Sequence, residues 1–497
     1  MNNFWLLTPE FLVTGLAFIL LAVDLFIQDR HRGILPWIAF FGLLIITGVI
    51  VLVDSSGDLY NGALVFDEFT KYFRLLLVLV AVFIVLMSRD YVKNRLENIG
   101  EFYGILIFTL VGAMLLSSSS ELLTAYISLE LLSFGLYVLV AFDRYNPKSN
   151  EAGTKYILLG AFSSAIILYG ISHIYGLLGT TKFIEIAEAL SGLSEMSPGL
   201  ILGFVLILTG LLFKLAAVPF HMWAPDVYEG SPVPITAWLS VGSKIAVVAL
   251  VVRFFMFGFI PAPGGTDWQL IVVLISVATM VIGNLLALVQ SNLRRLLAYS
   301  SIAHVGYLLM GVAAFVQFGD DGSSSVSSSH LVSNGIIFHV TAYAVTNLAA
   351  FMSIIFVHNH TGRDDIKSLA GLSTRQPLVA LVLVSALFSL AGLPVFAGFT
   401  SKFYLFNAVG LQGLLWLVGV GIVASLISLY YYLMVARQIY IEEAENESHI
   451  PVPLFGKVIL CILLIVMVIG GIWPQPVMEI IQSATDSVMS VGLIRHL

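Results

Sequence analysis

The chain has 497 residues, of which 59% are hydrophobic and 11% are charged, and its mean hydropathy is +0.98. Soluble domains carry about 25% charged residues, so this composition excludes a soluble globular protein and predicts a membrane protein. The chain has few basic residues and no basic tail, which argues against nucleic-acid binding. The single cysteine, Cys461, excludes an internal disulfide and a cysteine-ligated metal or iron–sulfur centre.

Apolar segments follow one another along the whole chain. Residues 1–32 lack the basic stretch and the small-residue cleavage site of a signal peptide, so they predict a retained first span. Windows of about 20 apolar residues predict fourteen transmembrane helices, which begin near residues 8, 34, 71, 102, 122, 154, 199, 231, 268, 298, 332, 376, 411 and 454. Helices are expected because lipid offers no hydrogen-bond partner to an open backbone. The predicted fold class is an all-α polytopic membrane protein.

Basic residues orient these spans, because cytoplasmic loops carry the excess of Lys and Arg. With the N-terminus outside, fourteen basic residues fall in cytoplasmic loops: Arg30, Arg32, Arg89, Lys93, Arg95, Arg144, Lys148, Arg294, Arg295, Arg363, Lys367, Arg375, Arg437 and Lys457. Five fall on the opposite side: Lys71, Arg74, Lys182, Arg253 and Arg495. This bias predicts that both termini lie on the outer side.

Two polar segments lie between predicted spans. The serine-rich stretch 319–330 predicts a flexible outer connection, and residues 182–197 predict a short interfacial helix. Neither segment is assigned a function.

Ionisable residues remain inside the predicted spans, where each charge costs about 3 kcal/mol. They are one glutamate, four lysines and three histidines: Glu130, Lys155, Lys214, Lys244, Lys402, His221, His304 and His339. Five unpaired charges would together cost on the order of 15 kcal/mol, which equals the whole stability of a robust protein. These groups must therefore pair, contact water or lose their charge for part of the time.

One structural interpretation pairs Glu130 with Lys214 and lets the other lysines reach the membrane interface. It is strongest for Lys155, because Glu151 lies four residues earlier, at the ordinary spacing of a helical ion pair. Lys214 and Lys402 lie deep within their spans and favour a functional interpretation. Desolvation favours a neutral amine, whereas a carboxylate about 7 Å away favours the ammonium by roughly 2.4 kcal/mol at an effective dielectric near 20. A movable Glu130 would thus load and unload a proton on Lys214.

Two predicted spans contain helix breakers beside a buried lysine. Pro219 follows Lys214 in the seventh span, and Gly392 and Pro394 precede Lys402 in the twelfth. Such breaks are tolerated where the freed backbone lines a hydrated cavity, and one in each half of a chain is typical of internally repeated transporters. Ordinary proline kinks are the alternative.

The matching breaks predict two five-helix repeats with discontinuous seventh and twelfth helices. Corresponding spans are five apart, and this odd number gives the two repeats inverted orientations. The predicted organisation is an N-terminal three-helix segment (1–99), a first repeat (100–257), a second repeat (268–440) and a C-terminal helix (454–497).

Three long segments carry the most specific signal: LLFKLAAVPFHMWAPDVYEGSPVPITAWLSVGSK (211–244), NLRRLLAYSSIAHVGYLLMG (292–311) and SLAGLPVFAGFTSKFYLF (389–406). They resemble the antiporter-like membrane subunits of respiratory complex I, the proton-translocating NADH:quinone oxidoreductase. The resemblance covers roughly residues 100–440. The PDVYEGSP segment (225–232) and Lys402 are similar to the N type of these subunits rather than to the M type.

The resemblance implies roles for four residues of the predicted spans. Glu130 matches the glutamate that pairs with the lysine of the broken seventh span, here Lys214. Lys244 matches the central lysine that passes protons between two half-channels. Lys402 matches the ionisable group of the broken twelfth span, at the far exit.

The resemblance also implies auxiliary groups. His221 and His304 occupy positions where the family places relay or structural groups, and Glu151 and Lys155 match a charged pair of N-type subunits. Arg294 departs from the lysine of many relatives, so the resemblance implies no titrating role at this position.

The mechanism that the resemblance implies places the redox chemistry outside this chain. Quinone reduction elsewhere alters the Glu130–Lys214 interaction, and a proton then passes from Lys214 to Lys244 and on to Lys402 through bridging water. The chain has no cysteine cluster, no glycine fingerprint beside a strand and no evident haem-ligand pair. NADH, FMN, iron–sulfur clusters and quinone are expected in partner subunits of the complex. These partners would be membrane-arm subunits of the A, H, J, K, L and M types, together with lipids, in a bacterial plasma (inner) membrane.

Two other functions stay open. The chain could belong to a multisubunit cation/proton antiporter or a membrane-bound hydrogenase, because the charged residues alone do not distinguish these machines. It could also be a scaffold subunit without transport, although lysines spread over both halves argue against that function.

Overall fold

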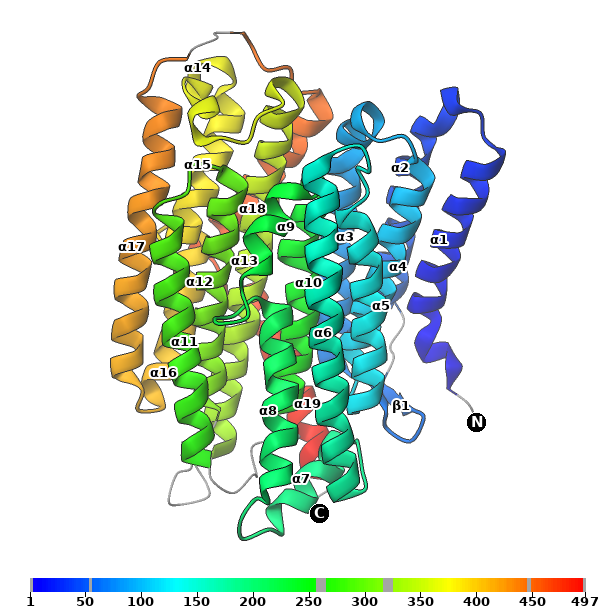
Figure 1. The fold of residues 1–497 in the computed structure, drawn as a ribbon, viewed down its shortest axis with the longest axis vertical. Helices are drawn as coiled ribbons and strands as arrows, with labels where there is room; N and C mark the ends of the chain where they lie inside the picture. The colour runs from blue at the N-terminus through cyan, green and yellow to red at the C-terminus, as the bar shows by residue number, and fades with distance from the viewer. Residues whose placement is uncertain (1–2, 53–55, 256–264, 316–324, 445–447, 495–497) are drawn as a thin grey trace.

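The computed structural model describes residues 3–52, 56–255, 265–315, 325–444 and 448–494. Within these ranges the chain forms a bundle of long helices that run along one common direction (Figure 1). Thirteen of the described helices are long and apolar enough to cross a membrane. Two shorter helices, α15 (Pro377–Ala391) and α16 (Ala397–Leu411), follow one another at the twelfth predicted span. Each of the fourteen predicted spans thus corresponds to a helix or to a pair of helices, which confirms the predicted fold class.

The N-terminal part consists of three long helices and a small hairpin. Its elements are α1 (Thr8–Phe26), α2 (Leu35–Leu52), β1 (Gly57–Leu59), β2 (Leu64–Phe66) and α3 (Glu68–Arg95), with 3-10 turns at Phe4–Leu7 and Asp29–Ile34. The two strands pair antiparallel, with Gly57 opposite Phe66. Asp67 then caps α3, because its carboxylate accepts a hydrogen bond from the Thr70 backbone N–H at 2.7 Å.

The next group of helices contains the first break. Its members are α4 (Ile99–Ser118), α5 (Leu122–Val140), α6 (Pro147–Leu178), α7 (Phe183–Ser191), α8 (Pro198–Leu215), α9 (Trp223–Gly230) and α10 (Val233–Phe254). Helix α7 occupies most of the segment for which the sequence predicts a short helix. Helix α8 ends where Ala216 takes a left-handed conformation with φ 61°, and the short helix α9 begins seven residues later. Every residue of α10 is buried.

The second half of the chain contains the second break. Besides α15 and α16, its helices are α11 (Gly265–Ala287), α12 (Leu293–Ala314), α13 (Ser325–Thr361), α14 (Leu372–Arg375) and α17 (Leu415–Tyr440), with a 3-10 turn at Ile366–Leu369. Gly392 ends α15 with φ 86°, and Val395 has φ 83° in the connection to α16. Helices α10, α12 and α13 form the most enclosed part of the bundle. Part of the predicted 319–330 connection lies outside the described residues, and α13 begins within its remainder.

The segment 454–497, for which the sequence predicts one helix, contains two. They are α18 (Leu454–Ile472) and α19 (Gln475–Ile494). Pro474 lies between them and lacks the N–H that would continue α18. Helix α19 packs against α3 and α13, where the Thr485 hydroxyl donates to the Asn334 side-chain oxygen at 2.7 Å.

Two arginines assigned from the sequence to outer loops lie inside helices instead. Arg74 in α3 and Arg253 in α10 are only 2% and 1% exposed. An Arg74 guanidinium nitrogen lies 2.7 Å from Glu10 Oε1, and Arg253 donates two 3.0 Å hydrogen bonds to the Asp67 carboxylate. A count of basic residues in loops does not detect that these arginines are buried, because the carboxylates that pair with them are far away in the sequence. Arg495, assigned to the same side, lies outside the described residues.

Removal of one member of a buried ion pair should destabilise the bundle. We expect Arg253→Met to lower the stability by about 3–5 kcal/mol, because the Asp67 carboxylate stays buried without its partner. A second substitution, Asp67→Asn, should restore part of this loss, since asparagine removes the charge and still caps α3. The melting temperature in mild detergent measures both changes, and Arg437→Met, which removes a solvent-exposed pair with Glu442, is the control. Equal melting of the single and double variants contradicts the prediction.

Candidate functional site

Lys214 lies among hydroxyl groups and one carboxylate between α5, α6 and α8. Its Nζ is 3.5 Å from Glu130 Oε1 and donates to Ser133 Oγ at 2.9 Å and to the Tyr137 hydroxyl at 3.3 Å. Ser164 donates to Glu130 Oε1 at 2.5 Å and lies 3.4 Å from the amine. Helical spacing puts Glu130, Ser133 and Tyr137 on one face of α5. The predicted partners are therefore in contact, both directly and through a serine.

The break after α8 gives Lys214 its position at a helix end. Lys214 is the penultimate residue of α8, in the last turn, where the negative end of the helix dipole favours a positive charge. The Phe213 carbonyl, in the last turn of α8, accepts a 2.9 Å bond from the Ala216 backbone N–H and a second 2.9 Å bond from the Trp223 indole. The side chain of Trp223, at the start of α9, thus satisfies part of the freed backbone of α8.

Lys244 lies in the centre of the bundle, and no carboxylate pairs with it among the residues that the structure describes. It is 4% exposed and donates to the Ser301 carbonyl at 3.1 Å and to the Ser301 hydroxyl. The same hydroxyl is 3.3 Å from the Tyr228 hydroxyl and accepts from the Tyr343 hydroxyl at 2.8 Å. Ser301 therefore connects Lys244 with two tyrosines of α9 and α13.

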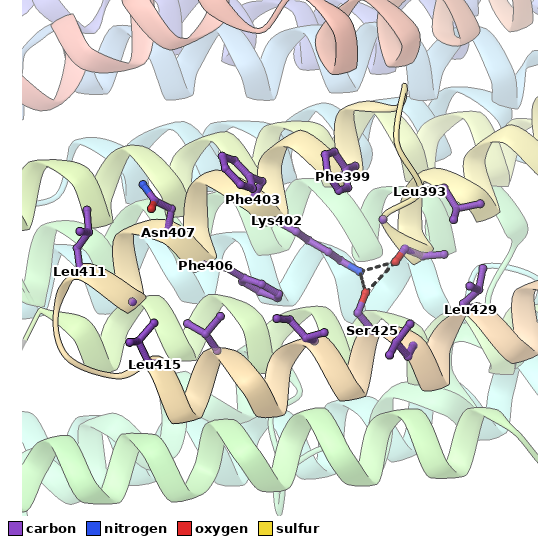
Figure 2. A pocket seen from close by; sticks show the side chains of 16 residues that line it. Leu393, Phe399, Lys402, Phe403, Phe406, Asn407, Leu411, Leu415, Ser425 and Leu429 are labelled. Carbon is purple, nitrogen blue, oxygen red and sulfur yellow. Dashed lines mark hydrogen bonds between the residues drawn. The ribbon is translucent and has the colours of Figure 1, made fainter.

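Lys402 is held by the carbonyl end of the broken helix (Figure 2). Its Nζ donates to the Leu390 carbonyl at 2.8 Å, the Ala391 carbonyl at 3.1 Å and the Ser425 hydroxyl at 2.8 Å. These carbonyls lack helical N–H partners because α15 stops at Ala391. A Cβ added at Gly392 would lie 3.1 Å from the Lys402 side chain, so a glycine suits both the left-handed conformation and the close approach.

Two stacked histidines lie between the surroundings of Lys244 and those of Lys402. His304 Nδ1 is 3.2 Å from His339 Nε2, and His339 Nδ1 is 3.2 Å from the hydroxyl of Ser401, which directly precedes Lys402. The His304 ring also contacts the Tyr343 ring, with centroids 5.2 Å apart. The sequence analysis assigned no role to His339. The signal that could have identified it was its position inside a predicted span. Its place next to His304 follows only from the packing of α12 on α13.

His221 does not join this series of contacts. It lies in the connection between α8 and α9, where its buried Nδ1 has no hydrogen-bond partner among the described residues.

Glu151 and Lys155 belong to a separate charged cluster at one end of α6, α9 and α12. The cluster consists of three basic and three acidic residues: Lys148, Glu151, Lys155, Asp226, Glu229 and Arg295. Lys155 is 41% exposed and lies 2.7 Å from carboxylate oxygens of both Glu151 and Asp226. The i,i+4 pair predicted from the sequence is therefore present, and Lys155 is not one of the enclosed amines.

Arg294 forms a second charged group beside this cluster. It donates to the Ser231 carbonyl at 2.7 Å and to the Asp364 carboxylate, which also lies 2.7 Å from His358 Nδ1. Burial raises the pKa of the Asp364 carboxyl, but the His358 hydrogen bond and the Arg294 charge outweigh it and leave that pKa below the ordinary 3.8. Arg294 thus fastens the start of α12 to its neighbours.

Within the described residues, no group of three or more His, Cys, Asp or Glu side chains is placed to hold a metal ion. Around the three buried lysines, the described residues supply hydroxyls, imidazoles and one carboxylate, that of Glu130. Each of these groups can donate or accept a proton.

The fold and this enclosed row of proton-exchanging groups define a polytopic membrane protein of the antiporter-like class. A sequence model of the NADH:quinone oxidoreductase/Mrp antiporter transmembrane family matches residues 119–428, and the chain belongs to this family. The NADH-quinone oxidoreductase subunit N of Moorella thermoacetica is 41% identical over 477 residues, which cover 96% of this chain and 97% of that protein. Subunit N of Rhodospirillum rubrum is 37% identical and covers 96% of both chains.

Solved structures show the same fold. A chain of respiratory complex I from Thermus thermophilus with bound aureothin superposes with a TM-score of 0.78 at 27% identity, and covers 95% of this chain and 99% of that one. A chain of the Mrp complex from Dietzia sp. gives a TM-score of 0.81 at 21% identity and covers 98% and 99%. The latter likeness concerns the fold alone.

The lowered pKa of Asp364 predicts a pH-dependent contribution to stability. An ionised Asp364 stabilises the fold fully above its ordinary pKa of 3.8, and this contribution is lost as the pH falls through its lower folded value. Asp364→Asn should therefore lower the melting temperature near neutral pH, by a loss of about 1.5–3 kcal/mol. The difference from the unmodified protein should shrink below pH 3.8. The matched control is Asp365→Asn, which removes the carboxylate that pairs with exposed Arg363. If the melting temperatures of Asp364→Asn and the unmodified protein differ as much below pH 3.8 as they do near neutral pH, the prediction is contradicted.

Proposed function

We propose that this chain is the N-type membrane subunit of an NADH–quinone oxidoreductase and that it translocates protons through its core. The shared name of relatives 37–41% identical over nearly the whole chain supports the first part. The observation that carries the second part is the presence of three buried amines, Lys214, Lys244 and Lys402. Hydroxyl and imidazole groups lie between the last two: hydrogen bonds join Lys244 to Tyr343 through Ser301 and join His304 to Ser401 through His339, and the Tyr343 and His304 rings are in contact.

The Glu130–Lys214 pair is the proposed control point. At a separation of 3.5 Å the carboxylate favours the ammonium by roughly 4–5 kcal/mol at an effective dielectric near 20. A charge displacement in neighbouring subunits that draws Glu130 away removes this interaction, and desolvation then favours the neutral amine. Lys214 releases its proton toward Lys244. No hydrogen bond between described residues joins these two amines, so bridging water belongs to the proposal.

From Lys244 the proposed route follows the contacts already described. Ser301 and Tyr343 lead to His304, and His339 leads to Ser401 beside Lys402. No hydrogen bond between described residues joins Tyr343 to His304 or the Ser401 hydroxyl to the Lys402 amine, so bridging water belongs to these two steps as well. A neutral imidazole accepts a proton on one nitrogen while it donates from the other, so two histidines in series relay a proton without rotating. Lys402 is the last proposed station before the exit. His221 and the Glu151–Lys155 pair keep the auxiliary roles that the family resemblance implies.

The proposal assigns electron transfer to partner subunits. NADH, FMN, iron–sulfur clusters and quinone would bind there, and this chain would receive only the electrostatic change that quinone reduction produces. It would lie in a bacterial plasma membrane with both termini outside, beside membrane-arm subunits of the A, H, J, K, L and M types. The predicted inverted repeats, with a broken helix in each, would provide one half-channel from each half of the chain.

Loss of the control pair should uncouple the subunit. We expect Lys214→Met and Glu130→Gln to lower the proton translocation that depends on this subunit about tenfold or more, because the first proton acceptor or its charge partner is missing. The measurement is NADH-driven proton uptake by inverted membrane vesicles, normalised to assembled complex and to the rate of quinone reduction. Lys182→Met, which removes only a pair with Glu185 at the rim, should pump normally.

The same assay separates the alternatives. Full pumping by both variants contradicts the relay and favours a scaffold subunit. Proton movement that follows an imposed sodium gradient without electron donor contradicts the oxidoreductase assignment and favours a cation/proton antiporter.

The histidine pair gives a second, independent test. His339→Leu removes the group between His304 and Ser401, and we expect a loss of pumping of about tenfold or more while the complex assembles. Thr341→Val on the same helix removes hydrogen bonds to the Tyr72 hydroxyl and to the Ile337 carbonyl, each 2.7 Å long, and should leave pumping unchanged. Equal pumping by the two variants excludes His339 from the route.

A further inference from the structure

Each of the three buried lysines lies over the face of a tyrosine ring. Lys402 has the shortest of these contacts, with its Nζ 4.9 Å from the centre of the Tyr307 ring. The corresponding distances to tyrosine rings are 5.8 Å at Lys214 and 5.7 Å at Lys244. The face of an aromatic ring carries partial negative charge, so it attracts an ammonium within about 6 Å of its centre. The contact at Lys402 is therefore the one in which a ring most strongly favours the charged amine.

The groups around Lys402 leave a role for this ring. Among the described residues, no carboxylate forms an ion pair with Lys402, and its N–H groups contact two carbonyls and the Ser425 hydroxyl. Within its described residues, helix α15 contains no titratable side chain, and those of α18 are Lys457 and Cys461. The titratable side chains that face Lys402 from the other helices packed on α16 are histidines and tyrosines: His304 and Tyr307 of α12, His339 of α13, and Tyr431 and Tyr432 of α17. The negative charge next to the ammonium thus comes from neutral oxygens and from the ring.

The Tyr307 ring is held in place by packing. Its side chain is 1% exposed, and its hydroxyl has no hydrogen-bond partner among the described residues. The ring meets the His304 ring at 5.4 Å and 87° and the His339 ring at 6.2 Å and 88°. On another side it contacts the Phe406 ring at 5.8 Å. The ring, and not the hydroxyl, is therefore the part of Tyr307 that touches both histidines and Lys402.

We propose that Tyr307 is a positioning residue for proton transfer at Lys402, where the face of its ring holds the amine and favours the ammonium form. The ring takes the place that Glu130 has beside Lys214. A carboxylate would be left buried without a counter-charge when the amine lost its proton, whereas the ring is neutral in both states. The ring thus helps Lys402 to accept a proton and does not prevent its release.

The inference has one part that rests on the proposed function and one that does not. That the proton held by Lys402 is a translocated one belongs to the proposed function. That the ring favours the ammonium is a statement about the equilibrium of the amine alone, and it is open to a direct measurement.

Chemical labelling of the Lys402 amine in the assembled complex tests the effect of the ring. Acetic anhydride reacts with a neutral amine and not with an ammonium, so short pulses over a pH series report the fraction of neutral amine. Mass spectrometry quantifies acetylation of Lys402 relative to exposed Lys93 of the same chain. We expect Tyr307→Leu to move the pH of half-maximal labelling lower by about one unit, because a desolvated cation–π contact is lost. Tyr307→Phe keeps the ring and should leave this pH unchanged.

A ring of nearly unchanged shape controls for effects of misfolding or of altered packing. Pentafluorophenylalanine incorporated at position 307 resembles phenylalanine in shape, but its fluorines withdraw negative charge from the face of the ring. It should lower the pH of half-maximal labelling as Tyr307→Leu does. An unchanged value with this residue overturns the proposal, and so does a shift in Tyr307→Phe as large as that in Tyr307→Leu.

Proton pumping separates this inference from the proposed function. NADH-driven proton uptake by the pentafluorophenylalanine protein should fall at alkaline pH and recover when the pH is lowered by about one unit. Full pumping by Lys402→Met would count against the relay function of Lys402, while the labelling still decides the effect of the ring. Impaired pumping by Lys402→Met together with unshifted labelling would overturn only the role of Tyr307.

Discussion

The cost of taking an amine out of water is the constraint on which the arrangement of the core depends. Lys214, Lys244 and Lys402 are each at most 9% exposed, yet among the described residues only Lys214 forms an ion pair with a carboxylate. The other two are satisfied by carbonyl and hydroxyl oxygens. A neutral oxygen forms hydrogen bonds with both the charged and the neutral form of an amine. A buried carboxylate, in contrast, would lose its counter-charge when the amine beside it became neutral. Neutral ligands therefore allow these amines to change their protonation state.

The helix breaks supply much of that solvation. An unbroken helix uses its carbonyls internally, and lipid cannot replace a lost partner. Where α15 stops, its free carbonyls turn to Lys402, and where α8 stops, the Phe213 carbonyl turns to Trp223. The second break thus brings Lys402 into contact with backbone carbonyls at the end of α15, whereas Lys214 beside the first break is solvated by side chains. The same break before α16 also borders the groove between α16 and α17.

Buried arginines follow the opposite pattern. Arg74 and Arg253 are as enclosed as the lysines, but each has a carboxylate at hydrogen-bond distance, Glu10 or Asp67. Arginine keeps its proton under all ordinary conditions, so a buried arginine needs a permanent counter-charge. These pairs join α1 to α3 and α3 to α10. The bundle thus separates fixed charges, which connect helices, from titratable amines, which occupy its centre.

The sequence by itself determined the transmembrane helices and the two breaks, because both depend on local chemistry. Lipid forces apolar windows into helices, and Pro219 and Gly392, near Lys214 and Lys402, disfavour continuation of the helix at these two places. The pairing of Glu130 with Lys214 was also predictable, since one glutamate stood among four lysines. Tertiary structure alone decided that His339 meets His304, that Ser301 serves Lys244, that Arg74 and Arg253 are buried and that Lys155 is exposed. These outcomes depend on contacts between helices far apart in the chain, and hydropathy windows carry no information about which faces of such helices meet.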